Sequence, residues 1–160
     1  MNKNFFEIKN VDFNVSGKTK VKNVSFSIEN EGDIICLLGP SGIGKTTILR
    51  TIAGLEGINK GSIKLNGKVI SSEKINIDPE DRNISLAFQD NSLFPHYTVE
   101  KNILLGAERN KEKSGKKISL KEIVDLLDIF HILNKYPHEI SAGEAQRASL
   151  ARSLITQPDL

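Results

Sequence analysis

One octapeptide constrains the possible folds of this chain more than any other stretch. It reads Gly39-Pro40-Ser41-Gly42-Ile43-Gly44-Lys45-Thr46. The pattern G-x-x-x-x-G-K-[ST] is met at every fixed position. An apolar run of strand length, 34–38, precedes the octapeptide, and a helix-like run, 47–54, follows it and stops at a glycine. This order predicts a buried strand, a glycine-rich loop and a helix in direct succession.

The residue types of this loop suit the binding of phosphate groups. Glycines let backbone N–H groups turn inward around phosphate oxygens, and the start of a helix adds free N–H donors and the positive end of its dipole. Lys45 is placed to reach the outer phosphates, and the Thr46 hydroxyl is placed to bind Mg²⁺. The alternative, a glycine-rich turn without a ligand, does not account for both flanking elements. We therefore expect a nucleotide-binding loop, which by itself leaves the kind of nucleotide protein open.

Composition fits one globular domain and argues against two kinds of charge-driven binding. The chain has 160 residues, of which 38% are hydrophobic and 26% are charged, enough for a packed core. Its 22 basic and 20 acidic residues nearly balance, which argues against binding nucleic acid or a membrane surface through net charge. The only cysteine, Cys36, excludes an intramolecular disulfide and is expected to be a small buried hydrophobe. No apolar run approaches the ~20 residues of a membrane span and the N-terminus lacks a secretory core, so we expect a cytosolic chain.

Hydrophobic patterning predicts two kinds of strand, one partly exposed and one buried on both faces. Five segments have the pattern of strands: 5–15, 24–28, 34–38, the hairpin 61–70 and 84–88. Strict alternation puts Val24, Phe26 and Ile28 on one face, whereas the continuous run at 34–38 is typical of a strand buried on both faces. Asn66-Gly67 is the dipeptide of a tight type I′ turn. We therefore expect a partly exposed antiparallel sheet that leads into a buried parallel one.

Three helices are expected in the second half of the chain. Thr98 can cap the first, Ser119 and Glu122 form a capping box for the second, and the third begins near Ser141. The charged stretch 108–117 is expected to be a solvated loop. Helical spacing predicts that these residues face a core: Val99, Ile103, Leu104, Ile123, Leu126, Leu127, Phe130, Leu133, Ala145, Ala148, Ala151, Leu154 and Ile155.

A second motif lies at the start of the last helix, where residues 140–147 read Ile-Ser-Ala-Gly-Glu-Ala-Gln-Arg. On its own this is an ordinary helix cap, with Ser141 at the N-cap and Glu144 three residues on. Together with the phosphate loop, and with Gln89 at the end of a predicted strand, it resembles the ATP-binding subunit of ABC transporters. In that family a signature of the type L-S-G-G-Q leads into a helix that contains Q-R. Residues 52–56 and 88–99 add a likeness to the importers of maltose, polyamines, ferric iron and molybdate, and the resemblance covers essentially all 160 residues.

The resemblance implies an α/β fold, with the sheet core of a P-loop NTPase, an N-terminal antiparallel β subdomain and an inserted α-helical subdomain. Residues 1–160 would then be a partial ATP-binding domain. Its parts are the β subdomain and phosphate-loop core at 1–89, the helical subdomain at 90–140 and the signature helix at 141–160. ATP and Mg²⁺ are the implied ligands. The residues implied to bind the triphosphate are Gly39, Pro40, Ser41, Gly42, Ile43, Gly44, Lys45, Thr46 and Thr47.

Further roles follow from the same resemblance. Gln89 matches the glutamine that contacts Mg²⁺ and the attacking water, so Lys45 and Gln89 are the implied catalytic residues, and Thr46 and Gln89 the implied metal ligands. The signature closes over ATP held by a second ATP-binding subunit in a head-to-tail dimer; its residues are Ser141, Ala142, Gly143 and Glu144. Such ATPases bind transmembrane permease subunits, and indirectly a solute-binding protein, at the cytoplasmic face of the membrane. Nucleic acid is not an expected partner.

Three positions depart from the family pattern. Val15 aligns with the aromatic residue that stacks on adenine, and Phe13, on the same face of the strand, is the alternative. Ala142 replaces the first signature glycine, at a cost of about 1 kcal/mol if that position needs a positive φ. Glu144 replaces the glutamine; its carboxylate is expected to fold back as a helix cap, and near a phosphate it would repel.

The resemblance also implies a missing segment, because the family's next strand, with its Asp-Glu pair, is expected directly after Leu160. That pair helps to hold Mg²⁺ and activates the attacking water. We therefore expect a core that lacks its C-terminal part, an unpaired sheet edge with exposed apolar surface, and little hydrolysis by this chain alone. The expected function is ATP binding and, in the completed dimer, hydrolysis that powers import of a small solute. Two alternatives stay open: a module that binds nucleotide without turnover, and an ABC ATPase that acts away from a membrane.

Overall fold

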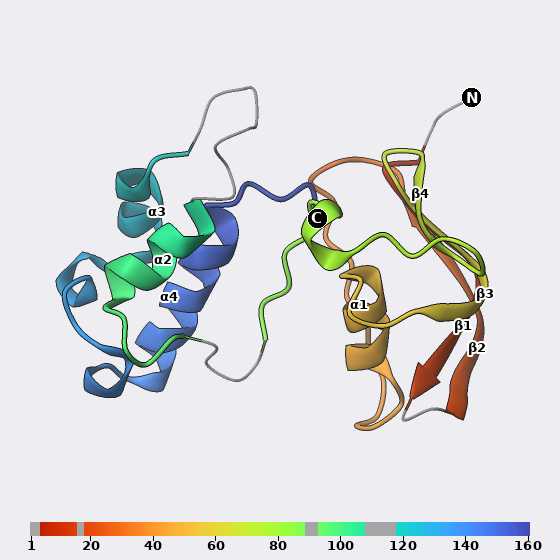
Figure 1. The fold of residues 1–160 in the computed structure, drawn as a ribbon, viewed down its shortest axis with the longest axis horizontal. Helices are drawn as coiled ribbons and strands as arrows, with labels where there is room; N and C mark the ends of the chain where they lie inside the picture. Colours follow the sequence, from red (N-terminus) through yellow and green to blue (C-terminus); the bar gives the residue numbers. More distant parts are fainter. Residues whose placement is uncertain (1–3, 16–17, 89–92, 108–117) are drawn as a thin grey trace. The chain divides into compact units, whose positions relative to one another are not determined.

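A computed structural model of the chain describes residues 4–15, 18–88, 93–107 and 118–160. The chain divides into two compact units. The first comprises the residues up to Ile84 together with Asp159, and the second comprises Ser85–Pro158 together with Leu160. The first unit carries the sheet and the second carries most of the helices (Figure 1).

A four-stranded antiparallel sheet forms the first unit, with strand order β2-β1-β3-β4. Its strands are β1 (Phe6–Val15), β2 (Lys18–Ile28), β3 (Ile58–Leu65) and β4 (Lys68–Ser72). Helix α1 (Lys45–Ile52) contacts β1, and a short 3-10 helix, η1 (Pro79–Asp81), follows the sheet (Figure 1). The phosphate-loop octapeptide therefore leads directly into a helix, as its spacing predicts.

The predicted antiparallel strands and their turn are confirmed. Ile28 is buried and Val24 and Phe26 are half-buried, as the alternating pattern on β2 predicts. Asn66 and Gly67 join β3 to β4 with φ angles of 51° and 74°, the two positive values of a type I′ turn. These features depend on residues close together in the sequence, and so they could be read from it.

Two predicted strands, 34–38 and 84–88, are wrong. Neither segment forms a strand, and within the described residues no strand pairs with either of them. Ile34 is 89% exposed and Leu38 91% exposed, and Cys36 is exposed rather than buried. A single extended segment cannot satisfy its backbone groups without a neighbouring strand.

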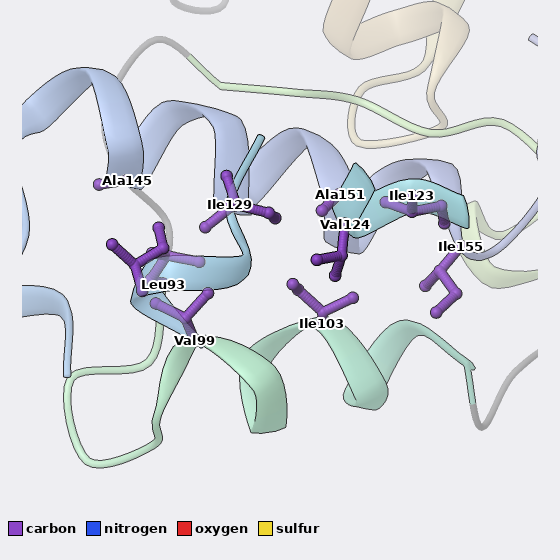
Figure 2. Close-up of a cluster of buried hydrophobic side chains, with 11 residues drawn as sticks. Leu93, Val99, Ile103, Ile123, Val124, Ile129, Ala145, Ala151 and Ile155 are labelled. Carbon is purple, nitrogen blue, oxygen red and sulfur yellow. The ribbon is translucent and has the colours of Figure 1, made fainter. Parts of the chain in front are cut away.

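The second unit is a small helical layer around one hydrophobic cluster. Its helices are α2 (Val99–Ala107), α3 (Leu120–Leu127) and α4 (Ala142–Leu154), with the 3-10 helices η3 (Phe130–Ile132) and η4 (Pro137–Glu139). Side chains from α2 point toward those of α3 and α4 (Figure 2). The buried members are Leu93, Val99, Ile103, Ile123, Val124, Ile129, Ile132, Ala145, Ala148, Ala151 and Ile155. Among the helices of the described part of the chain, none has the length and apolar character needed to cross a membrane.

Local signals in this unit are confirmed, whereas three core assignments are wrong. The capping box of α3 is present, with a 3.2 Å bond from the Glu122 N–H to the Ser119 hydroxyl. However, Leu104 is 40%, Leu126 70% and Phe130 75% exposed. Helix α3 ends at Leu127 and the next residue has a φ of 51°. The helical spacing that predicts an inward Phe130 therefore does not apply, because α3 ends before that residue.

Candidate nucleotide-binding site

The phosphate loop adopts a backbone that only glycine takes up readily. The φ angles of Gly39, Gly42 and Gly44 are 155°, 77° and 110°, a region that costs residues with a Cβ atom about 1 kcal/mol or more. Gly44 is the N-cap of α1 and has no side chain to cap the helix. The first N–H groups of α1 therefore remain available to an anion at the loop.

Lys45 supplies the positive charge of the site. Its ammonium group donates hydrogen bonds to the carbonyl oxygens of Gly39, at 2.7 Å, and Pro40, at 2.8 Å. The side chain thus folds back over the loop that precedes it. The first turn of α1 reads Lys-Thr-Thr-Ile and contains no acidic residue that would repel a phosphate.

The two threonines after Lys45 have different surroundings. Thr46 is exposed, and its hydroxyl is an oxygen ligand of the kind that Mg²⁺ prefers. Thr47 is buried, and its carbonyl accepts a 2.8 Å bond from the Thr51 hydroxyl within α1. Within the described residues no group of three or more His, Cys, Asp or Glu could hold a metal ion. Thr46 thus offers one side-chain oxygen of the kind that fits Mg²⁺.

The remaining residues predicted for this site are less well defined by the structure. Gln89 lies outside the described residues, and so does the side chain of Val15, whose backbone pairs with Lys18. Phe13, the alternative adenine contact, is 0% exposed and lies in the sheet core between β2 and β3. A ring in that position has no free face to stack on a base, so Phe13 is not available as the substitute.

The second motif forms the N-terminus of α4. Ser141 is the N-cap, and its hydroxyl accepts a 3.3 Å bond from the Glu144 N–H. The Glu144 carboxylate accepts 2.7 Å bonds from both the Ser141 N–H and the Ser141 hydroxyl. This is the complete capping box that the local spacing predicts.

Glu144 is also tied to a neighbouring 3-10 turn. Its other carboxylate oxygen lies 2.9 Å from His131 Nε2. The hydroxyl and then the backbone N–H of Ser141, followed by His131, lower the pKa of Glu144 to about 2. The carboxylate is therefore ionised at neutral pH, and it occupies the anion-binding end of α4 with the chain's own negative charge.

Ala142 and Gly143 are both helical residues of α4. Ala142 therefore does not incur the backbone cost that a positive φ would bring. A Cβ atom on Gly143 would have the Arg147 guanidinium as its nearest neighbour, at 3.9 Å. The backbone at the signature is thus relaxed, and its unusual feature is the charge of Glu144.

Two buried polar residues were missed by the sequence analysis. Arg82, directly after η1, is 2% exposed, and Asn102, on α2, is 0% exposed. The Arg82 guanidinium and the Asn102 amide donate hydrogen bonds to backbone carbonyls. Apolar periodicity cannot reveal such residues, because it carries no information about the hydrogen-bond partners of a polar side chain.

Comparison with known proteins agrees with this architecture. The family model described as ABC transporter matches residues 21–160. The ferric-ion import ATP-binding protein FbpC of Haemophilus influenzae is 37% identical over 161 residues, which is 100% of this chain and 46% of that protein. The spermidine/putrescine import ATP-binding protein PotA of Nitrosospira multiformis is 40% identical over 96% of this chain and 41% of that protein. The chain thus spans less than half the length of these relatives.

Solved structures share the fold. The structure of cbiO1 from Clostridium perfringens, part of the ABC transporter complex cbiONQ, aligns with a TM-score of 0.77 and 24% identity over 97% of this chain and 62% of that one. A structure described as the ATP binding subunit of an ABC transporter aligns with a TM-score of 0.78 and 21% identity, over 96% of this chain and 63% of that one. These likenesses confirm the predicted fold class, and the family match and import relatives confirm the predicted resemblance. The chain is a member of the ABC transporter family.

Proposed function

We propose that the chain binds MgATP at Gly39–Thr47 and forms the nucleotide-binding part of an importer ATPase. The observation that carries the proposal is the position of Lys45, whose ammonium group is held by the loop carbonyls of Gly39 and Pro40 at the open end of α1. Two weak carbonyl contacts can be exchanged for charged phosphate oxygens, which bind an ammonium group more strongly. The positive φ angles of the loop and its family membership support the same assignment.

The proposal gives roles to the loop glycines, Lys45 and Thr46, and to Gln89 and Val15 outside the loop. The glycines and the first turn of α1 direct N–H groups at the phosphates, and Lys45 neutralises the outer ones. Thr46 provides one oxygen ligand for Mg²⁺, and Gln89 provides a second and orients the attacking water. When bound, Mg²⁺ neutralises charge that develops on the transferring phosphate. Val15 supplies an apolar contact to the base, without ring stacking.

We assign the second motif to a partner's nucleotide. Residues Ser141–Glu144 would close over ATP held by a second copy in a head-to-tail dimer, so a complete site needs two chains. The proposed parts of the ATP-binding domain are the β subdomain and phosphate-loop core at 1–89, the helical subdomain at 90–140 and the signature helix at 141–160. The relatives named above are import proteins, which supports the proposal that the chain binds transmembrane permease subunits. It would do so at the cytoplasmic face of the membrane, and a solute-binding protein would be an indirect partner. The loop 90–97, next to Gln89, is the proposed contact surface, and in its described part Phe94 is 45% exposed.

Calorimetry with MgATP tests the nucleotide site. Lys45→Ala should remove measurable binding, because the loop then has no cation for the outer phosphates. Lys68→Ala is the matched control, because it removes an exposed lysine from β4 in the same unit. Unchanged affinity in Lys45→Ala, or equal loss in both variants, would refute the assignment.

A second candidate function is nucleotide binding without turnover. The ionised Glu144 carboxylate at the start of α4 favours it, because a negative charge there opposes the approach of a partner's γ-phosphate. A phosphate-release assay on this chain tests the second candidate. Steady release that disappears in Lys45→Ala would refute nucleotide binding without turnover.

A further inference from the structure

Arg82 is a buried side chain of the first unit whose polar groups all have hydrogen-bond partners. It is 2% exposed, and a guanidinium has five N–H donors in a fixed planar arrangement. The five acceptors are Ile77 O at 2.7 Å, Thr51 O and Ile52 O both at 2.9 Å, Ser71 Oγ at 2.9 Å and Asn76 Oδ1 at 2.8 Å. Every donor of this buried cation can therefore be satisfied at the same time.

These acceptors belong to three parts of the first unit, namely α1, β4 and the segment that follows β4. Thr51 and Ile52 are the last two residues of α1, and Ser71 lies on β4. The carbonyls at the end of a helix lack helical partners and carry the negative end of its dipole. Arg82 thus satisfies the C-terminal end of α1 and ties it to the sheet.

Arg82 also packs closely against the residues that follow α1. Gly54 follows α1 with a φ of 89°. A Cβ atom on Gly54 would lie 2.5 Å from Arg82 Nε and 2.9 Å from the guanidinium carbon. The chain therefore needs a glycine here both for its backbone conformation and for the close approach of Arg82.

The other end of α1 is the proposed phosphate site. Helix α1 has only eight residues, so it spans about 12 Å. A short rigid helix transmits a tilt at its last turn to its first turn. The positions of Gly44 and Lys45 therefore depend on what holds Thr51 and Ile52.

We propose that Arg82 is a positioning residue for the nucleotide site, fixing α1 from its C-terminal end so that its first turn meets the phosphates. This inference rests on the proposed MgATP site at Gly39–Thr47. Arg82 touches no nucleotide in this account and acts through α1 alone.

Calorimetric titration of MgATP into Arg82→Lys and Ser71→Ala tests the inference. Lysine keeps the charge but has at most three donors and no planar fork, so the Kd for MgATP should rise about tenfold or more. Ser71→Ala removes one acceptor and should raise Kd about threefold. The matched control is Arg50→Met, which breaks the half-exposed Arg50–Glu56 ion pair of 2.7 Å near the same helix end. Its Kd should stay within about twofold of the wild type.

The number of binding sites separates positioning from folding. A purely structural role would lower the fraction of competent molecules and leave the Kd of the rest unchanged. Unchanged Kd in Ser71→Ala and in folded Arg82→Lys would overturn the inference, as would an equal rise in Arg50→Met. If Arg82→Lys does not fold, Ser71→Ala decides. A wild-type chain that binds no MgATP would instead refute the proposed function itself.

Discussion

Asn102 should be among the residues whose loss most destabilises the helical unit. It lies on α2 and is 0% exposed. Its carbonyl oxygen accepts a 2.7 Å bond from the Phe94 N–H. Its amide nitrogen lies 3.1 Å from Phe94 O, 3.1 Å from Tyr97 O and 3.0 Å from Thr98 O. One side chain thus bonds four backbone groups of the turn before α2.

The size of the effect follows from these contacts. The amide has two hydrogens and one acceptor in use, which amounts to three net hydrogen bonds of about 1 kcal/mol each. Asn102→Ala should therefore lower the free energy of unfolding by about 3 kcal/mol, since alanine removes the acceptor of the Phe94 N–H and the donors to the Phe94, Tyr97 and Thr98 carbonyls. For a unit of this size about 4–8 °C in Tm corresponds to each kcal/mol.

Urea unfolding followed by circular dichroism at 222 nm measures this loss, because the sequence has no tryptophan to report by fluorescence. Leu126→Ala is the control, since Leu126 lies on α3 and is 70% exposed; it should change stability by no more than about 0.5 kcal/mol. The reasoning fails if Asn102→Ala also stays within about 0.5 kcal/mol of the wild type.

Two further predictions concern α4 and its packing. The folded-state pKa of Glu144, about 2, lies below the ordinary 4.5, so its ionised form adds stability that is complete above pH 4.5 and lost as the pH falls toward 2. Urea midpoints measured at pH 6 and pH 3 should therefore differ less in Glu144→Gln than in the wild type, and an equal difference would contradict the sign. Gly143→Ala should leave stability unchanged or raise it by about 0.5 kcal/mol. Gly106→Ala should lower the stability by about 1–3 kcal/mol, because its Cβ atom would lie 2.4 Å from Arg152 O. Thermal unfolding of both glycine variants checks this, and a larger loss of stability in Gly143→Ala than in Gly106→Ala would contradict it.

The elements that could be predicted are those encoded by neighbours in the sequence. The turn at Asn66-Gly67, the capping boxes of Ser119 and Ser141, and the loop before Lys45 each depend on residues within a few positions of one another. Turn chemistry and helix capping act over that range. The backbone of the candidate site was therefore readable before any tertiary contact was known.

The elements that could not be predicted depend on distant partners. The apolar pattern of 34–38 is that of a strand, but a strand forms only against another strand, and none pairs with it among the described residues. Arg82 looks like a loop residue because the Thr51 and Ile52 carbonyls that it binds are 31 and 30 residues away in the sequence. Phe130 was misplaced because α3 ends before it.

The most direct test of the central claim is a structure of this chain with Mg²⁺ and a non-hydrolysable ATP analogue. The distance to measure is from Lys45 Nζ to the nearest phosphate oxygen. We predict about 2.7–2.9 Å, with the bonds to Gly39 O and Pro40 O, now 2.7 Å and 2.8 Å, lengthened or broken. An analogue bound elsewhere, with Lys45 still held by both carbonyls, would contradict the account.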